Sequence, residues 1–322
     1  MSIFYILLGF LLLVFGGDFL VKSSVGLSFK FNLSKIIIGM TVVSFATSAP
    51  ELIVSLSAAL DGSTDMALSN VIGSNVANIA LVLGLTAIVS AIYVDKSFFK
   101  MNWPAMMFFS LILFWFLKND LLLSRIEGAI LFVLLILFII YMIWEARKNK
   151  DEILTDLDDD IDGDLEEASY SKIFLWLGLG AAALFFGSKF LVSGAKDIAS
   201  SLGISEGVIG LTVVAIGTSV PELAASIIAA LKGEKAISLG NLIGSNVFNI
   251  GSVLGLTAII SPLKVNPIVL EKDIYWMLGV AFILLPLALI PTKYNISKLK
   301  GSFLFIAYIT FIYLAFQSGS IS

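Results

Sequence analysis

A chain of 322 residues with 58% hydrophobic and 14% charged residues, and a mean hydropathy of +1.01, does not have the composition of a water-soluble protein. Cysteine and histidine are both absent, which excludes thiolate and imidazole metal sites, Cys or Ser-His nucleophiles, haem ligation and disulfides. The net charge is −4 and the sequence has no basic cluster, so no positively charged surface for binding nucleic acid is expected. The composition predicts an integral membrane protein.

Ten apolar segments with polar residues between them are predicted to span the bilayer as helices, because apolar runs of about 20 residues are enough to cross ~30 Å of hydrocarbon. They cover residues 3–21, 36–60, 66–90, 103–117, 125–145, 171–192, 207–231, 236–261, 268–290 and 300–317. The first segment follows no basic region and has no small-residue cleavage site, so we expect it to be retained and not removed as a signal peptide.

The orientation is predicted from the lysines and arginines of the short loops. Fourteen of the 20 basic residues fall on one side of the ten-span arrangement and six on the other. Basic loops favour the cytoplasmic side. We therefore expect both termini outside and the 146–170 loop in the cytoplasm.

The predicted cytoplasmic loop is acidic and partly matches a calcium-binding loop. Asp158, Asp160, Asp162 and Gly163 fit the start of an EF-hand loop. The twelfth position is Ser169, where such loops place a bidentate glutamate. We expect a solvated acidic linker there.

An internal repeat is the strongest feature of the sequence. Residues 39–90 align without a gap on residues 210–261, at a constant offset of 171, with about 30 of the 52 positions identical. Each half holds five spans, an odd number, so the two halves must cross the membrane in opposite orientations. The prediction is an all-α integral membrane protein with ten transmembrane helices in two inverted five-helix repeats. Its parts are residues 1–145 (first repeat), 146–170 (acidic loop) and 171–322 (second repeat).

Two charged residues occupy equivalent positions in the two halves, Asp18 and Lys189. The inversion places them near opposite membrane surfaces. We expect each to extend toward its nearer surface and not to pair with the other.

The polar residues of each repeat are concentrated in two strings in the middle of spans, at 46–51 and 73–78 and again at 217–222 and 244–249. Each half carries one glutamate in these strings, Glu51 or Glu222. A carboxylate at this depth costs roughly 2.5–3.5 kcal/mol unless it is paired, protonated or bound to a cation. No basic residue is positioned to pair with either glutamate.

Oxygen ligands of other kinds surround these glutamates in the sequence. Thr47 and Ser48 lie one helical turn before Glu51 and share its face, and Ser74 and Asn78 are spaced in the same way. Pro50, like its equivalent in the second half, is expected to free backbone carbonyls one turn earlier. Together these groups predict an all-oxygen site for hard cations such as Ca²⁺ or Na⁺.

The paired T-S-x-P-E and G-S-N-x-x-N strings in inverted halves resemble the α-repeats of the calcium/cation antiporter superfamily, and most of all its sodium/calcium exchanger branch. The resemblance implies electrogenic exchange of Ca²⁺ against Na⁺ by alternating access, without a cofactor. It also implies a set of ion ligands in this chain. These are Thr47, Ser48, Glu51, Ser74, Asn78, Thr218, Ser219, Glu222, Ser245 and Asn249, with the backbone carbonyls of Ser44 and Ala215 as further Na⁺ ligands.

Asn249 departs from the family pattern, because many prokaryotic exchangers of this type carry an aspartate there. The chain therefore has two site carboxylates and not three, which leaves the counter-ion open between Na⁺ and H⁺. Two carboxylates ~4 Å apart repel by roughly 4 kcal/mol at an effective dielectric constant of 20, so a site without a cation is expected to hold a proton. A proton-coupled Ca²⁺ antiporter is the alternative function.

Other classes of function fit the sequence less well. A cation channel could use the same oxygens, but inverted repeats around one buried site favour alternating access. A membrane enzyme is not expected, since His, Cys and a loop long enough for a catalytic domain are lacking. Asn75 and Asn246 lie off the predicted ligand face, so we expect them to pack helices. The expected partners are Ca²⁺, Na⁺ or H⁺ and the lipid bilayer, with a monomer as the working assumption.

Overall fold

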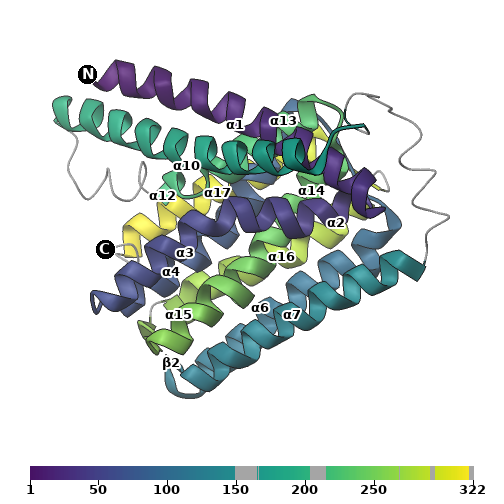
Figure 1. Ribbon diagram of the computed structural model, residues 1–322. Coiled ribbons are helices and arrows are strands. Elements are labelled where there is room, and N and C mark those ends of the chain that lie inside the picture. The colour runs from purple at the N-terminus through teal and green to yellow at the C-terminus, as the bar shows by residue number, and fades with distance from the viewer. Residues whose placement is uncertain (149–164, 166, 204–214, 268, 291–293, 319–322) are drawn as a thin grey trace.

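The computed structural model describes residues 1–148, 165, 167–203, 215–267, 269–290 and 294–318, and this part is nearly all helical (Figure 1). Nine of its helices are long and apolar enough to cross a bilayer, and Val220–Leu231 is a shorter apolar helix. The start of the predicted 207–231 span and most of the acidic loop lie outside the described residues. The prediction of an all-α membrane protein with ten spans in two inverted repeats is confirmed.

From α4 and α14 onward the described helices and strands follow the same order in the two halves, and the η elements are π-helical turns. The first half contains α1 (Ser2–Phe31), α2 (Lys35–Ile38), η1 (Gly39–Val43), α3 (Ser44–Leu60), α4 (Thr64–Val76), η2 (Ala77–Leu83), α5 (Gly84–Val89), β1 (Ile92–Tyr93), η3 (Phe98–Asn102), α6 (Trp103–Asp120), β2 (Leu122–Leu123) and α7 (Arg125–Lys148). The second contains α10 (Tyr170–Ser201), α12 (Ala215–Gly217), α13 (Val220–Leu231), α14 (Lys235–Phe248), η5 (Asn249–Leu254), α15 (Gly255–Ile260), β3 (Leu263–Lys264), η6 (Val269–Asp273), α16 (Ile274–Leu289), β4 (Asn295–Ile296) and α17 (Lys298–Ser318).

Two helices are longer than the sequence predicted. The expected spans 3–21 and 171–192 are observed as α1 and α10, with 30 and 32 residues. In α1 the polar residues after the apolar run do not end the helix, because the Ser23 and Ser24 hydroxyls donate to the Leu20 carbonyl at 2.8 and 2.6 Å. Hydroxyls satisfied in this way remain compatible with a helix in an apolar environment.

Helices α1 and α10 lie side by side along one edge of the molecule (Figure 1). A glycine seam of Gly9, Gly16, Gly180 and Gly187 lines their contact. A Cβ atom on Gly9 would lie 2.8 Å from the Gly187 carbonyl oxygen, and one on Gly16 would lie 3.0 Å from that of Gly180. Small residues allow membrane helices to approach this closely. The 171-residue offset relates Gly9 to Gly180 and Gly16 to Gly187, so the repeat extends into these helices.

Short strands join the two halves at the ends of the helices. β1 pairs antiparallel with β4, with Ile92 opposite Ile296, and β2 pairs antiparallel with β3, with Leu123 opposite Leu263. Each strand therefore hydrogen-bonds to a strand of the other half. Strands of two residues are too short to give a periodic signal, and the sequence did not predict them.

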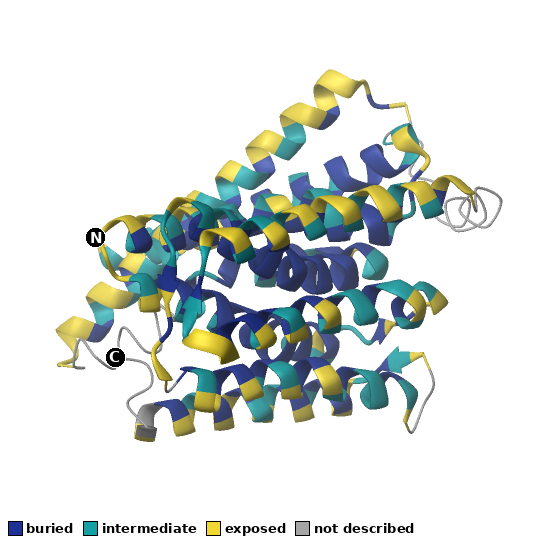
Figure 2. Ribbon diagram, turned by 90° about the horizontal axis from the view of Figure 1, so that it is seen from below, coloured by how far each residue is buried: buried dark blue, intermediate teal, exposed yellow. Residues whose placement is uncertain are grey.

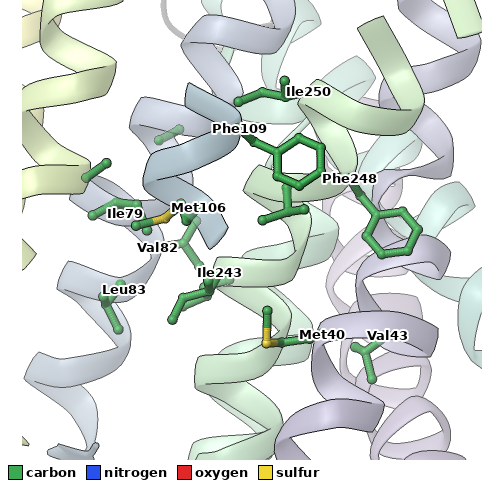
Figure 3. Close-up of a cluster of buried hydrophobic side chains, with 14 of the residues drawn as sticks. Met40, Val43, Ile79, Val82, Leu83, Met106, Phe109, Ile243, Phe248 and Ile250 are labelled. Atoms are coloured by element: carbon green, nitrogen blue, oxygen red, sulfur yellow. The ribbon is translucent and has the colours of Figure 1, made fainter. Parts of the chain in front are cut away.

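The centre of the molecule is formed by the α4–η2–α5 and α14–η5–α15 segments, where buried residues are concentrated (Figure 2). Of the most apolar stretch of each segment, 83% is buried, against 22% in α7. A cluster of buried apolar side chains links these segments to η1 and α6 (Figure 3). Its labelled members are Met40, Val43, Ile79, Val82, Leu83, Met106, Phe109, Ile243, Phe248 and Ile250. The polar strings 73–78 and 244–249 therefore lie on the most deeply buried helices.

Candidate cation site

The two predicted glutamates lie at the centre of the fold. Glu51 on α3 and Glu222 on α13 are both 0% exposed, and their carboxyl groups are close enough to interact electrostatically. The Thr47 and Ser48 hydroxyls lie beside the Glu222 carboxyl. Within the described residues, neither glutamate forms an ion pair with a lysine or arginine. The two repeats thus bring two buried carboxyl groups together without a basic partner.

Eight buried side-chain oxygen atoms of the predicted ligands have no hydrogen-bond partner among the described residues. We call them the oxygen cage. They are Ser48 Oγ, Ser219 Oγ, Asn78 Oδ1, Asn249 Oδ1 and both carboxyl oxygens of Glu51 and of Glu222. Buried polar atoms in proteins are normally satisfied, and a group of unsatisfied acceptors requires an explanation. A bound cation is the partner that such a group of oxygens would fit.

Two hydroxyl pairs connect the two halves. Thr47 Oγ1 lies 3.3 Å from Ser245 Oγ, and Thr218 Oγ1 lies 3.4 Å from Ser74 Oγ. The 171-residue offset converts the first pair into the second. Four of the predicted ligands therefore meet in two equivalent contacts, which gives the site a pseudo-twofold arrangement.

The two asparagines that were predicted as ligands occupy π-helical turns. Asn78 is the second residue of η2 and Asn249 is the first residue of η5, and both are 0% exposed. Short π-helical turns within α-helices occur frequently at functional sites. Their amide nitrogens are already bonded, since Asn78 Nδ2 donates to Asn246 Oδ1 at 3.1 Å and Asn249 Nδ2 donates to Asn75 Oδ1 at 3.0 Å. Asn75 and Asn246, which were expected to pack helices, are therefore also hydrogen-bonded to predicted ligands.

The two prolines have different effects on the backbone. α3 continues through Pro50, whereas α12 ends at Gly217 and α13 begins at Val220, directly before Pro221. The Gly217 carbonyl accepts a hydrogen bond from Ser188 Oγ on α10 at 2.6 Å. The expected freed carbonyl therefore exists in the second half and has a partner there. Ser188 was not predicted from the sequence, because α10 carries no motif at that position.

The remaining predicted ligands are the backbone carbonyls of Ser44 and Ala215. The Ser44 carbonyl is 3.4 Å from Thr47 Oγ1. Ala215 is the first residue of α12, and its side chain is outside the described part. Asn241 was not predicted, although its Oδ1 accepts from Thr47 Oγ1 at 3.0 Å. Asn241 lies four residues before Ser245, so helical spacing could have placed it on the ligand face.

The donor set of the site consists of carboxyl, hydroxyl and amide oxygens contributed equally by two inverted halves. Inverted repeats that meet at a buried polar site near the middle of the membrane define a class of membrane transporters. The fold and the site therefore assign the chain to that class.

The comparisons with known proteins identify the family. A family model described as sodium/calcium exchanger protein matches residues 1–144 and 172–317, and the chain belongs to this family. It is 32% identical to the sodium/calcium exchanger MaX1 of Methanosarcina acetivorans over 97% of each chain. It is 38% identical to the inner membrane protein YrbG of Escherichia coli over 86% of each. Among solved structures, the sodium-calcium exchanger NCX_Mj soaked with 10 mM Na⁺ and 10 mM Sr²⁺ matches with a TM-score of 0.81 and 30% identity, covering 97% of each chain. The chain is therefore a multi-pass membrane protein and a cation antiporter by family, not an enzyme.

Proposed function

We propose that this protein exchanges Ca²⁺ for Na⁺ by alternating access, with both ions bound at the oxygen cage near the middle of the membrane. The observation that carries the proposal is the set of eight buried, unpartnered oxygens contributed by both halves. The proposed ligands are Thr47, Ser48, Glu51, Ser74, Asn78, Thr218, Ser219, Glu222, Ser245 and Asn249, with the carbonyls of Ser44 and Ala215.

The charge of the cage favours a divalent cation. Glu51 and Glu222 together supply two negative charges when ionised, which matches one Ca²⁺. Ca²⁺ takes six to eight oxygen ligands, and the eight oxygens of the cage are enough for that number. The threonine and serine hydroxyls beside the carboxyl groups add neutral oxygen ligands, which can coordinate a monovalent cation such as Na⁺. The names of MaX1 and NCX_Mj as sodium/calcium exchangers support the same pair of ions.

The arrangement of the chain favours exchange over a static pore. The halves 1–145 and 171–322 are proposed to act as two inverted domains that contribute equally to the cage. Transporters built in this way bind substrate where the repeats meet and open to one side at a time. The bias of the basic residues favours both termini outside and the 146–170 loop in the cytoplasm.

The counter-ion is tested with reconstituted protein. We expect ⁴⁵Ca²⁺ uptake into proteoliposomes when an outward Na⁺ gradient is imposed at equal pH on both sides. Uptake driven only by a pH gradient, without competition from Na⁺, would replace the proposal by proton-coupled antiport. Single-channel currents without coupling would replace it by a channel.

The cage is tested with Glu51→Gln and Glu222→Gln. Either change leaves a single carboxylate to balance a divalent ion in a low-dielectric site, so Ca²⁺ flux should fall to background. Asp65→Asn is the matched control, because it removes one carboxylate at the exposed start of α4, away from the cage. Flux at the wild-type level in Glu51→Gln would rule out the cage as the transport site.

A further inference from the structure

We propose that Asn75 and Asn246 are positioning residues that fix the amides of Asn78 and Asn249 with the oxygen, and not the NH₂ group, facing the oxygen cage. Neither Asn75 nor Asn246 contributes an atom to the cage. The proposal rests on the proposed function of the cage as a cation site.

The backbone sets the orientation of the first two side chains. Asn75 Nδ2 donates to the Asn246 carbonyl at 3.3 Å, and Asn246 Nδ2 donates to the Asn75 carbonyl at 3.2 Å. A backbone carbonyl can only accept, so each side chain must present its NH₂ group to it. Both residues are buried, with 1% and 3% exposure. Their reciprocal bonds join the two halves and leave each Oδ1 directed elsewhere.

Each of these Oδ1 atoms then orients a ligand from the other half. Asn75 Oδ1 accepts from Asn249 Nδ2 at 3.0 Å, and Asn246 Oδ1 accepts from Asn78 Nδ2 at 3.1 Å. Because a carbonyl oxygen attracts the NH₂ group of the ligand, the ligand's own oxygen must turn away from it. Asn78 Oδ1 and Asn249 Oδ1 are the two amide oxygens of the cage.

Loss of either positioning side chain would free the ligand amide to rotate. A rotated amide presents the positive end of its dipole to a bound cation and removes one oxygen ligand. Loss of a hydrogen bond that orients a metal ligand typically weakens metal affinity about 10–100-fold. The loss should therefore appear in the apparent KM for Ca²⁺, with the maximal exchange rate largely kept.

The test compares Asn75→Ala, Asn246→Ala and the double variant in Na⁺-driven ⁴⁵Ca²⁺ exchange. Each single change should raise the KM for Ca²⁺ by about 10–100-fold, and the double change should raise it by less than the product of the two, since both act on one network. Asn102→Ala is the matched control, because Asn102 is buried in η3 and its Nδ2 donates to Ser97 Oγ, outside the cage. If an alanine variant does not fold, Asn75→Ser or Asn246→Ser takes its place with a polar group of smaller volume.

Two outcomes would overturn the positioning role. One is a rise in KM no larger than that of Asn102→Ala. The other is a loss confined to maximal rate and melting temperature, which a structural cross-link alone would explain. Wild-type protein that shows neither Ca²⁺ exchange nor Ca²⁺-dependent thermal stabilisation would contradict the proposed function instead, so the two failures are distinguishable.

A second inference concerns charged residues near the membrane surfaces. Asp18, expected to extend alone toward the surface, instead pairs with Lys22 at 2.9 Å on its own helix and with Lys232, which follows α13. The Asp18–Lys232 ion pair therefore links α1 to the end of a helix that carries a cage glutamate.

The other half contains the same pair of positions with the charges reversed. The 171-residue offset relates Asp18 to Lys189 and Lys232 to Asp61. Lys189 and Asp61 are both exposed, and within the described residues neither forms an ion pair. In addition, α1 packs along α13 more extensively than α10 packs along α3. The two halves thus differ in conformation at equivalent positions.

We infer that the Asp18–Lys232 and Asp61–Lys189 pairs close alternately, one near each membrane surface, and that each stabilises one of the two access states. Halves with such similar sequences can each adopt the conformation of the other, and this exchange underlies alternating access in inverted-repeat transporters. The exchange would bring Lys189 to Asp61 and separate Asp18 from Lys232.

The sequence contains no cysteine, so pairs of introduced cysteines can report on both states. Cysteines at positions 18 and 232, or at 61 and 189, are cross-linked with a short bis-maleimide, and a pair at 18 and 61 serves as the unreactive control. Lys189→Met should raise 18–232 cross-linking, and Asp18→Asn should raise 61–189 cross-linking, each by about 1.5- to 5-fold, the factor expected for an exposed ion pair. Unchanged yields in these charge variants, or no 61–189 product under any ion gradient, would overturn the inference. The measurement does not depend on which ion is transported.

Discussion

Asn249→Asp tests whether the oxygen cage is built for two carboxylates and not three. The side chain at position 249 now donates through Nδ2 to Asn75 Oδ1 at 3.0 Å. An ionised carboxylate cannot donate, so two buried acceptors would face each other, at a cost of roughly 1–3 kcal/mol. The added charge would also be repelled by Glu51 and Glu222, by roughly 4 kcal/mol for each neighbour at ~4 Å and an effective dielectric constant of about 20. The substitution therefore demands a compensating proton or cation.

A proton on the introduced carboxyl would solve both problems, because the protonated group is neutral and can donate to Asn75 Oδ1. Exchange by Asn249→Asp should therefore approach the wild-type rate at acidic pH and depart from it as the pH rises, unless an additional Na⁺ takes the place of the proton. In that case the apparent dependence on Na⁺ should become steeper. Asn249→Ala separates charge from lost oxygen, and we expect it to weaken apparent Ca²⁺ affinity by about tenfold, equivalent to about 1.4 kcal/mol, without a new pH dependence.

The assay is ⁴⁵Ca²⁺ exchange in proteoliposomes over a series of pH values and Na⁺ concentrations, with both variants and wild type reconstituted at equal density. If both variants match wild type in Ca²⁺ affinity, ion coupling and pH profile, then Asn249 is a packing residue and not a ligand. A pH dependence that is equally altered in both variants would refute the electrostatic reasoning, because only one of them adds a charge.

Three further changes test the packing and the hydroxyl contacts. Gly16→Leu should lower the free energy of unfolding by about 1–3 kcal/mol, because its Cβ would lie 3.0 Å from a backbone oxygen of α10. Thermal unfolding in detergent would show this, and Gly178→Leu, whose Cβ would meet no atom of the described residues within 4 Å, should have little effect. Thr47→Val removes a hydroxyl that lies 3.3 Å from Ser245 Oγ and donates to Asn241 Oδ1, so the KM for Ca²⁺ should rise and the melting temperature should also fall. Ser188→Ala leaves the Gly217 carbonyl without its 2.6 Å donor and should cost about 1–3 kcal/mol of stability; an unchanged melting temperature would contradict that estimate.

The parts of the fold that follow from hydrophobicity and the repeat were predictable from the sequence. Apolar length located the spans, and the duplication gave their inverted arrangement. The end of α1 was not predictable from hydropathy, because serine hydroxyls bonded to the Leu20 carbonyl allow the helix to continue beyond its apolar run. The break before Pro221 and the unbroken helix through Pro50 also differ although the sequences match. Such differences arise from contacts with other helices, which cannot be predicted from the local sequence.

The burial of the predicted site residues could be foreseen from the sequence, their roles as ligands stay a prediction, and their hydrogen bonds could not be foreseen. Helical spacing placed Thr47, Ser48 and Glu51 on one face, as the structure has them. Spacing also placed Asn75 off the ligand face, but it could not show the hydrogen bond from Asn249 to Asn75, because it considered one helix at a time. The partner of Asn75 Oδ1 comes from the other half of the chain, so the contact depends on how the halves meet.

The crossed strand pairs, β1 with β4 and β2 with β3, bear on the origin of the molecule. Each strand pairs with a strand of the other half, and the same reciprocity holds for the amides of Asn75 and Asn246. Two copies of a single five-helix polypeptide, inserted in opposite directions, could make all of these contacts with one another. The reciprocal contacts are therefore those expected if an antiparallel homodimer became one chain by duplication and fusion of its gene. Co-expression of the two separated halves would then be expected to rebuild the assembly.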